Sequence, residues 1–314
     1  MSQGVRAPTS PRRRAVLGLG ALSALAALAS CSTIGVLNAA SASPWIRQTR
    51  DIAYGPLGRQ RLDVYAPAPT GAGRRPVVVF FYGGSWDSGS KLDYRWTGLA
   101  LARRGYVTVI ADYRLYPDVV WPAFLQDGAA AVRWARDNAA SFGGDPDRLV
   151  LMGHSAGAYN AVDLAVDRRW LAGAGLDAAR DVRAVVGLSG PYDFLPVRTA
   201  ELKAIFGPEA ERPDTQPINH VDGGAAPMLL ITGDRDGVVD PGNSDRLAAR
   251  IRAAGGEAEV IHYPKLDHPM TVGSLATPLQ WMAPVMRDAV RFIDAETAER
   301  RRLSAIRKSL QRAA

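Results

Sequence analysis

Short apolar runs alternate with helical patterns along most of the chain. Residues 60–65 alternate between polar and apolar side chains, which is typical of a strand with one buried face. The segment Val77–Tyr82 is apolar throughout and rich in β-branched residues, so it indicates a strand that is buried on both faces. Further runs of this kind cover residues 107–111, 149–152, 182–188, 228–232 and 258–263.

Residues with the spacing of an amphipathic helix separate most of these runs. The predicted helices cover residues 96–104, 124–140, 158–167, 244–254 and 284–298. Alternation of this kind predicts an α/β fold, with a mostly parallel central sheet and helices on both of its faces. Because no repeat or linker interrupts the pattern, residues 45–299 are expected to form one domain.

One stretch, residues 191–226, is too long for an ordinary connection between a strand and the next element. It has a single short helical pattern near residues 201–206. We therefore expect it to form a small cap over the end of the sheet where the site lies.

The composition indicates a globular protein, and the distribution of charge argues against nucleic acid as a partner. Of the 314 residues 47% are hydrophobic and 22% charged, and the net charge is +7. Residues 1–31 contain four arginines and no acid, and residues 296–314 contain six basic residues and two glutamates. The body between them therefore carries a charge of about −1 and lacks the basic face that nucleic-acid binding requires.

The N-terminus has the pattern of an export signal. Three arginines at 12–14 precede an apolar stretch at 15–29, which is shorter than the roughly 20 residues of a transmembrane helix. The small residues that lead to Cys31 resemble a bacterial lipobox, which implies that Cys31 is lipidated. We therefore expect an exported protein with a signal peptide at 1–31, a lipid anchor at the membrane and a tether at 32–44. The basic tail at 300–314 is either a solvated helix face or a contact with anionic lipid.

Cysteine and histidine are too sparse to suggest a metal site. Cys31 is the single cysteine, and the four histidines are scattered along the sequence. We predict no metal and no organic cofactor.

The sequence Gly153-His-Ser-Ala-Gly157 lies between a predicted strand and a predicted helix. Gly-x-Ser-x-Gly in this context forms a sharp turn that presents the serine at the carboxyl end of the sheet. Ser155 is therefore the candidate nucleophile.

A second glycine-rich turn, Tyr82-Gly-Gly-Ser-Trp86, follows another strand. Glycines there let backbone N–H groups approach a ligand closely, as an oxyanion hole requires. The candidate residues of this hole are Gly83, Gly84, Ser85 and Ala156.

An acid and then a histidine are expected after the nucleophile. Asp234 and Asp236 both follow the strand at 228–232 and compete for the role of the acid. Among the histidines, His268 lies on a loop past the next strand, whereas His262 falls within that strand and His220 precedes the acid. Order and position therefore select His268 as the base.

These motifs resemble those of α/β-hydrolases, in particular the hormone-sensitive-lipase and feruloyl/acetyl-esterase (BD-FAE-like) branch. Five further segments carry the resemblance, at 105–107, 111–114, 121–122, 142–146 and 189–193. It covers roughly residues 52–292 and selects Asp236 through the pattern Gly-x-x-Asp-x-x-Val. Tyr82 departs from it, because these families have His-Gly-Gly-x-Trp at this point.

The resemblance implies a serine carboxylesterase with a Ser155–His268–Asp236 triad, acting on short-chain or aryl esters that are small molecules or linked to polysaccharide. Aromatic residues near the motifs are expected to line the substrate pocket: Tyr82, Trp86, Tyr159, Tyr192 and Phe194. An amidase or formamidase with the same triad stays an alternative, as does a lipoprotein that binds ligands at the surface without catalysis.

Overall fold

The computed structural model describes residues 34–69 and 73–298. Its centre is one eight-stranded sheet in the order β1-β2-β4-β3-β5-β6-β7-β8. The strands are β1 (Ile46–Ala53), β2 (Arg61–Pro67), β3 (Arg75–Phe81), β4 (Val107–Ala111), β5 (Gly144–His154), β6 (Val182–Leu188), β7 (Met228–Gly233) and β8 (Ala258–Tyr263). β1 and β4 each pair antiparallel with β2, and all other pairs are parallel.

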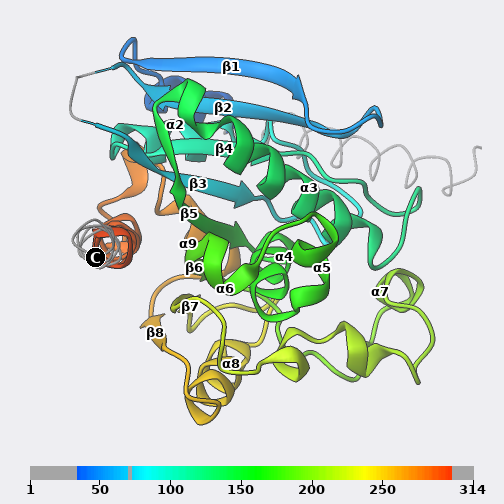
Figure 1. The fold of residues 1–314 in the computed structure, drawn as a ribbon. Coiled ribbons are helices and arrows are strands. Elements are labelled where there is room, and N and C mark those ends of the chain that lie inside the picture. The colour runs from blue at the N-terminus through cyan, green and yellow to red at the C-terminus, as the bar shows by residue number, and fades with distance from the viewer. Residues whose placement is uncertain (1–33, 70–72, 299–314) are drawn as a thin grey trace, which may run out of the picture.

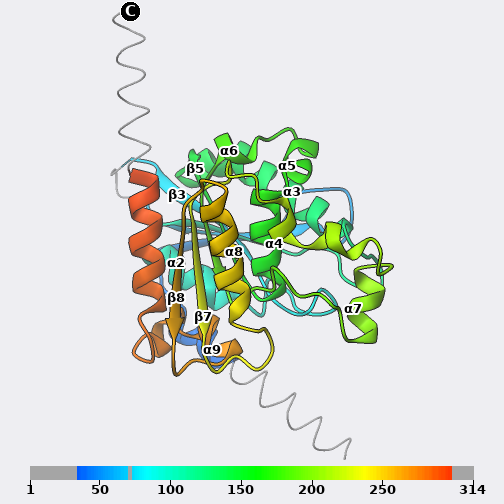
Figure 2. The ribbon, with the colours of Figure 1, turned by 90° about the horizontal axis from the view of Figure 1, so that it is seen from below.

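Helices cover both faces of the sheet, as the sequence predicted (Figures 1 and 2). α2 and a helix at residues 285–298 lie on one face, and α3, α4 and α8 lie on the other. The bounds are α2 (Arg95–Arg103), α3 (Ala123–Asn138), α4 (Ala156–Val166), α5 (Arg168–Gly173), α6 (Ala178–Asp181), α7 (Ala200–Ile205), α8 (Gly242–Ala253) and α9 (His268–Gly273). Four short 3₁₀ helices are η1 (Ala139–Phe142), η2 (Arg212–Thr215), η3 (Pro217–His220) and η4 (Thr277–Leu279).

Burial explains why the apolar runs were readable as strands. From Val77 to Phe81 every residue of β3 is buried, and β4, β6 and β7 are buried almost throughout. These central strands form the core because helices cover both faces of the sheet. Their packing fixes the positions of the strand ends from which the site is built.

β1 was not predicted, and its position explains why. It is an edge strand with exposed residues on both faces, and its register with β2 shifts between Thr49 and Ile52. Asp51 in this irregularity has a φ of 56° and bonds the buried Lys91, at 2.6 Å. A polar edge strand with a bulge lacks the regular alternation from which strands are recognised.

The predicted cap at 191–226 contains α7, η2 and η3, and α7 lies apart from the sheet (Figures 1 and 2). At the other end of the domain, residues 34–41, which fall within the predicted tether at 32–44, form a helix. Ser41 in this helix is buried and Leu37 packs against the core. The predicted signal peptide, Cys31 and the basic tail at 300–314 lie outside the described residues.

Candidate active site

Ser155 occupies a tight turn between β5 and α4. Its φ of 55° and ψ of −124° are unfavourable for a residue with a side chain, and a hydrogen bond from its N–H to the Leu188 carbonyl (2.9 Å) helps to hold it. A Cβ added to Gly153 would lie 2.1 Å from the Gly157 carbonyl oxygen, and one on Gly157 would lie 2.1 Å from that of Phe81. Only glycine fits on either side of the serine, so the motif is required by the close packing of β3, β5 and α4.

The turn after β7 holds Asp236 against His268. The Asp236 Oδ2 lies 2.8 Å from the His268 Nδ1, and its Oδ1 accepts hydrogen bonds from the N–H groups of Val238 and Val239, both 2.9 Å. Burial opposes charge on this carboxyl, but the bonds from His268 and the two amides outweigh it and lower the pKa of Asp236. An ionised Asp236 accepts the Nδ1 proton of His268, which leaves the Nε2 of His268 free to act as a base.

The competing acid, Asp234, serves a different histidine. Its Oδ1 lies 2.7 Å from the Nδ1 of His262, whose Nε2 lies 3.1 Å from Asp245. Burial lowers the pKa of His262, but the two carboxylates outweigh it and raise that pKa overall. This group is partly exposed and ties β8 to α8. A third histidine, His220, bonds the Asp214 carbonyl.

His154, the residue before the candidate nucleophile, links the parts of the site. Its Nε2 lies 3.0 Å from the backbone carbonyl of His268, and its Nδ1 lies 3.1 Å from the hydroxyl of Tyr94. The centres of the two imidazole rings are 4.8 Å apart. The link holds the backbone of His268 beside the turn that contains Ser155. In the described part of the chain the Ser155 hydroxyl itself makes no hydrogen bond, and such a bond commonly tightens only when substrate is bound.

The loop at 83–86, which the sequence analysis names as a candidate oxyanion hole, lies beside Ser155. Ser85 and Trp86 have φ values of 50° and 61°, and that of Gly84 is 134°. The Gly84 and Ser85 N–H groups bond no other described residue, and Ala156 is the first residue of α4, where helix N–H groups lack partners within the helix. Ser85 and Ala156 line the same cavity as Ser155, so their N–H groups are available to an oxyanion there. The Gly83 N–H is instead directed to the Tyr94 hydroxyl.

Tyr82, which replaces the histidine of the resembling families, is anchored by Arg59. The Nη2 of Arg59 donates to the Tyr82 hydroxyl (3.0 Å) and to the Gly89 carbonyl (2.6 Å), while its Nε donates to the Tyr113 carbonyl (2.7 Å). The Tyr82 ring also stacks between those of Tyr94 and Tyr113. One guanidinium therefore binds both ends of the glycine-rich loop, because Tyr82 precedes it and Gly89 follows it.

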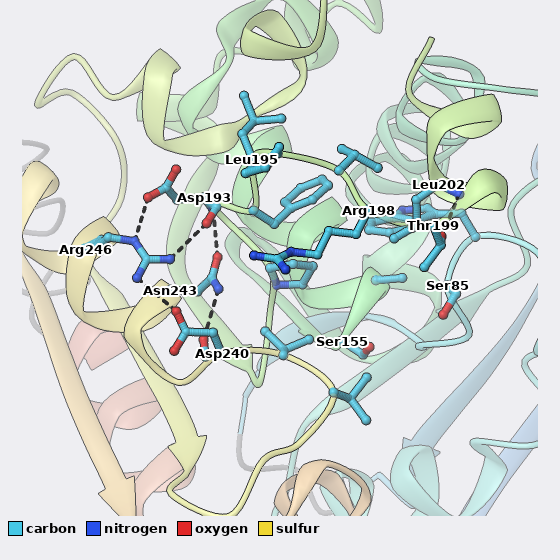
Figure 3. A pocket seen from close by; sticks show the side chains of 18 residues that line it. Ser85, Ser155, Asp193, Leu195, Arg198, Thr199, Leu202, Asp240, Asn243 and Arg246 are labelled. Atoms are coloured by element: carbon cyan, nitrogen blue, oxygen red, sulfur yellow. Dashed lines mark hydrogen bonds and ion pairs between the residues drawn. The ribbon is translucent and has the colours of Figure 1, made fainter. Parts of the chain in front are cut away.

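A cavity of about 440 Å³ opens above Ser155 (Figure 3). Its base is formed by Ser85, Ser155 and Ala156, and the predicted cap supplies Phe194 and Arg198. A volume of this size is in the range of small-molecule sites.

Two of the five aromatic residues predicted for the pocket, Trp86 and Phe194, line this cavity. Tyr82, Tyr159 and Tyr192 are fully buried and do not line it. The Trp86 indole donates to the Asn160 side chain at 3.0 Å, which fixes its ring at the cavity wall.

Sequence reasoning did not assign roles to His154, Tyr94, Arg59 or Arg198. A polar residue at the second position of Gly-x-Ser-x-Gly was the available signal for His154. Tyr94, Arg59 and Arg198 lie outside the motifs, and their partners are brought to them only by the fold. Among residues 34–69 and 73–298, no three His, Cys, Asp or Glu side chains gather closely enough to hold a metal ion. No helix in these ranges is long and apolar enough to cross a membrane.

The sheet order, the strained serine between β5 and α4 and the Asp236–His268 pair define an α/β-hydrolase fold. Comparison with known families makes the assignment specific. Residues 62–251 match the family model BD-FAE, and the chain belongs to this family.

Curated relatives are esterases by name. Isoprenylcysteine alpha-carbonyl methylesterase ICME of Arabidopsis thaliana is 30% identical over 239 residues, which cover 70% of this chain and 56% of the relative. Esterase LipQ of Mycobacterium tuberculosis is 30% identical over 251 residues, which cover 74% of this chain and 59% of LipQ. The chain thus spans little more than half the length of these relatives.

Solved structures share the fold. Esterase B from Lactobacillus rhamnosus, inhibited by a tributyrin phosphonate, aligns over 94% of this chain and 99% of its own with a TM-score of 0.76 and 20% identity. A truncated carbohydrate esterase from gut microbiota aligns over 82% and 99% with a TM-score of 0.69 and 23% identity. At these identities the likeness shows the fold alone.

Proposed function

We propose that the protein is a serine hydrolase of carboxylic esters with short-chain or aryl groups. The observation that carries this proposal is the strained Ser155 beside a His268 that is bonded to Asp236 at 2.8 Å. Membership of a family whose relatives are named esterases supports the same reaction class. The cavity of about 440 Å³ suits a small ester group.

The chemistry follows from the positions of the groups. The Ser155 Oγ attacks the ester carbonyl while the His268 Nε2 takes its proton, and the N–H groups of Ser85 and Ala156 bind the oxyanion. His268 then returns the proton to the departing alcohol, and the C–O bond breaks to leave an acyl group on Ser155. Water then attacks this acyl group while His268 takes its proton, and His268 passes that proton to the Ser155 Oγ as the acyl–oxygen bond breaks and the carboxylic acid leaves. Asp236 keeps the His268 Nδ1 protonated and stabilises the imidazolium.

Substitution of the nucleophile tests the proposal. Purified protein is expected to hydrolyse 4-nitrophenyl acetate, and Ser155→Ala is expected to lower kcat by at least about 10³-fold because the acyl-enzyme cannot form. The matched control is Ser141→Ala, whose exposed hydroxyl bonds only the Asn138 carbonyl. Absence of ester hydrolysis by correctly folded wild-type protein, or equal activity in Ser155→Ala, would reject the proposal. N-formyl and amide substrates in the same assay distinguish an esterase from an amidase.

We also propose that the protein is exported and lipid-anchored through Cys31. The support is the signal-like sequence at 1–31 alone. In a bacterial host, the wild-type chain should sediment with membranes and incorporate labelled fatty acid, whereas Cys31→Ser should do neither. Equal membrane recovery of the two proteins would reject the anchor.

A further inference from the structure

One charged side chain in the cavity is not used by the proposed mechanism. Arg198 comes from the cap, and its side chain reaches into the cavity above Ser155 (Figure 3). Arg198 is exposed, and over the part of the chain that the structure describes its guanidinium has no hydrogen bond and no ion pair.

The backbone on both sides of Arg198 is held in place. Val197 before it is buried, and Thr199 after it caps α7 by accepting a hydrogen bond from the Leu202 N–H (3.2 Å). α7 is in turn tied to the body of the domain, because the Trp121 N–H donates to the Ile205 carbonyl at 3.0 Å. The position from which Arg198 extends is therefore fixed by packing and by a helix cap.

The other charges of the cavity are already engaged with one another. Arg246 donates to the carboxylates of Asp193 (2.6 Å) and Asp240 (3.0 Å), and also to the Asp193 carbonyl (2.9 Å). Asn243 accepts from the Asp193 N–H and donates to the Asp240 carbonyl. Both carboxylates are thus directed to Arg246. Arg198 is therefore the cation of the cavity that is available to pair with a ligand.

We propose that the preferred ester carries a carboxylate on the half that enters this cavity, and that Arg198 binds it. A planar guanidinium binds a carboxylate through two parallel hydrogen bonds, and this geometry gives an exposed arginine its best chance of a favourable pair. The apolar walls formed by Trp86 and Phe194 suit a short chain between the carboxylate and the ester. This inference rests on the proposed ester hydrolysis at Ser155.

Matched substrate pairs test the inference, one pair for each half of the ester. The first pair is monoethyl glutarate and ethyl pentanoate, which differ by a terminal carboxylate on the acyl half. The second is 3-(butanoyloxy)propanoate and propyl butanoate, which place the same difference on the alcohol half. Measured by pH-stat titration, kcat/KM is expected to favour the anionic member of one pair by about fivefold, because the guanidinium is exposed and solvent screens the pair.

Variants of Arg198 identify the group responsible. Arg198→Gln is expected to bring the anionic-to-neutral ratio close to one, and Arg198→Glu to reverse it in favour of the neutral ester. Raised salt should reduce the wild-type preference, because it screens the pair. The control is Arg103→Gln, since Arg103 is exposed in the last turn of α2, away from the cavity, and should leave the ratio unchanged.

The outcomes separate the two proposals. Hydrolysis of neutral esters without preference for either anionic ester would overturn the role of Arg198 and leave the proposed function intact. A preference that survives in Arg198→Gln would also overturn it. No hydrolysis of any ester by folded protein would overturn the proposed function, and this inference with it.

Discussion

The hydrogen bonds of His154 permit one arrangement of protons. A carbonyl oxygen only accepts, so the His154 Nε2 must carry the proton that binds the His268 carbonyl. Its Nδ1 is then unprotonated and accepts a hydrogen bond from the Tyr94 hydroxyl. Burial, together with the nearby His268, lowers the pKa of His154 to about 3, so this neutral form persists at neutral pH. The His268 carbonyl therefore fixes the tautomer of His154, and Tyr94 completes the link by donating to the other ring nitrogen.

Removing the Tyr94 hydroxyl should weaken this link. Tyr94→Phe is expected to lower kcat about tenfold with little change in KM, since one hydrogen bond that positions the base is lost. His154→Gln, which can both donate and accept, should retain more activity than His154→Leu. Steady-state kinetics and melting temperatures measured together decide the matter. If both His154 variants melt early but keep the wild-type kcat, the link stabilises the fold without positioning His268.

At the scale of single residues, sequence prediction succeeded where a motif constrains the backbone. Ser155 was readable because glycines at 153 and 157 are required by contacts under 2.5 Å that any Cβ would make. Tyr94 and Arg198 could not be found in this way, because ordinary residues can occupy their local backbone. Their surroundings come from segments far away in sequence, and only the fold brings those segments together.

The turn between β5 and α4 is the element on which the site depends. A methyl group at Gly157 would overlap the Phe81 carbonyl of β3, so strand and helix would have to separate. Gly157→Ala is expected to destabilise the protein by about 1–3 kcal/mol or more, as overpacking does, and to lower activity. Thermal unfolding measures the loss.

Gly173→Ala is the matched control for this substitution. Gly173 ends α5, has no heavy atom near its added Cβ, and has no positive φ. Alanine there should be neutral or slightly stabilising, because it has the higher helix propensity. Equal melting temperatures for Gly157→Ala and Gly173→Ala would contradict the packing argument.

At the scale of elements, the strands with an apolar run were predicted closely and the polar edge strand β1 was not. The bounds of β4, β6 and β8 agree with the apolar runs at 107–111, 182–188 and 258–263. α4 begins at Ala156, two residues before the predicted start, because the helix starts directly after the strained Ser155. The short helices α5, α6 and α9 lack a full amphipathic period, so no pattern could indicate them.

For the molecule as a whole, one buried carboxyl couples stability to pH. Asp163 of α4 is buried, accepts a hydrogen bond from the Trp170 indole (3.0 Å), and has its other oxygen unpartnered. Burial and the neighbouring Asp167 raise the pKa of Asp163 well above its usual value. A raised pKa means that the folded state holds this proton where the unfolded state has lost it. Asp163 therefore reduces stability as the pH rises above about 4, the usual pKa of an aspartate.

Asp163→Asn should remove this effect while keeping an acceptor for Trp170. The melting temperature is expected to rise by a few degrees at pH 8, about 2–4 °C per kcal/mol gained, and to change little at pH 4. Asp137→Asn is the control, since Asp137 is half exposed and pairs only with Arg133 on the same helix. A gain of equal size at both pH values would show that ionisation of Asp163 is not its cause.

Because Arg59 anchors Tyr82, the effect of a substitution at either position depends on the residue at the other. A histidine at position 82 would lose the Arg59–Tyr82 hydrogen bond and the stack between Tyr94 and Tyr113, and a protonated imidazole would face a guanidinium. The step from tyrosine to the histidine of the resembling family pattern is therefore expected to be epistatic with position 59. A histidine at position 82 is therefore expected to be tolerated only together with a substitution of Arg59.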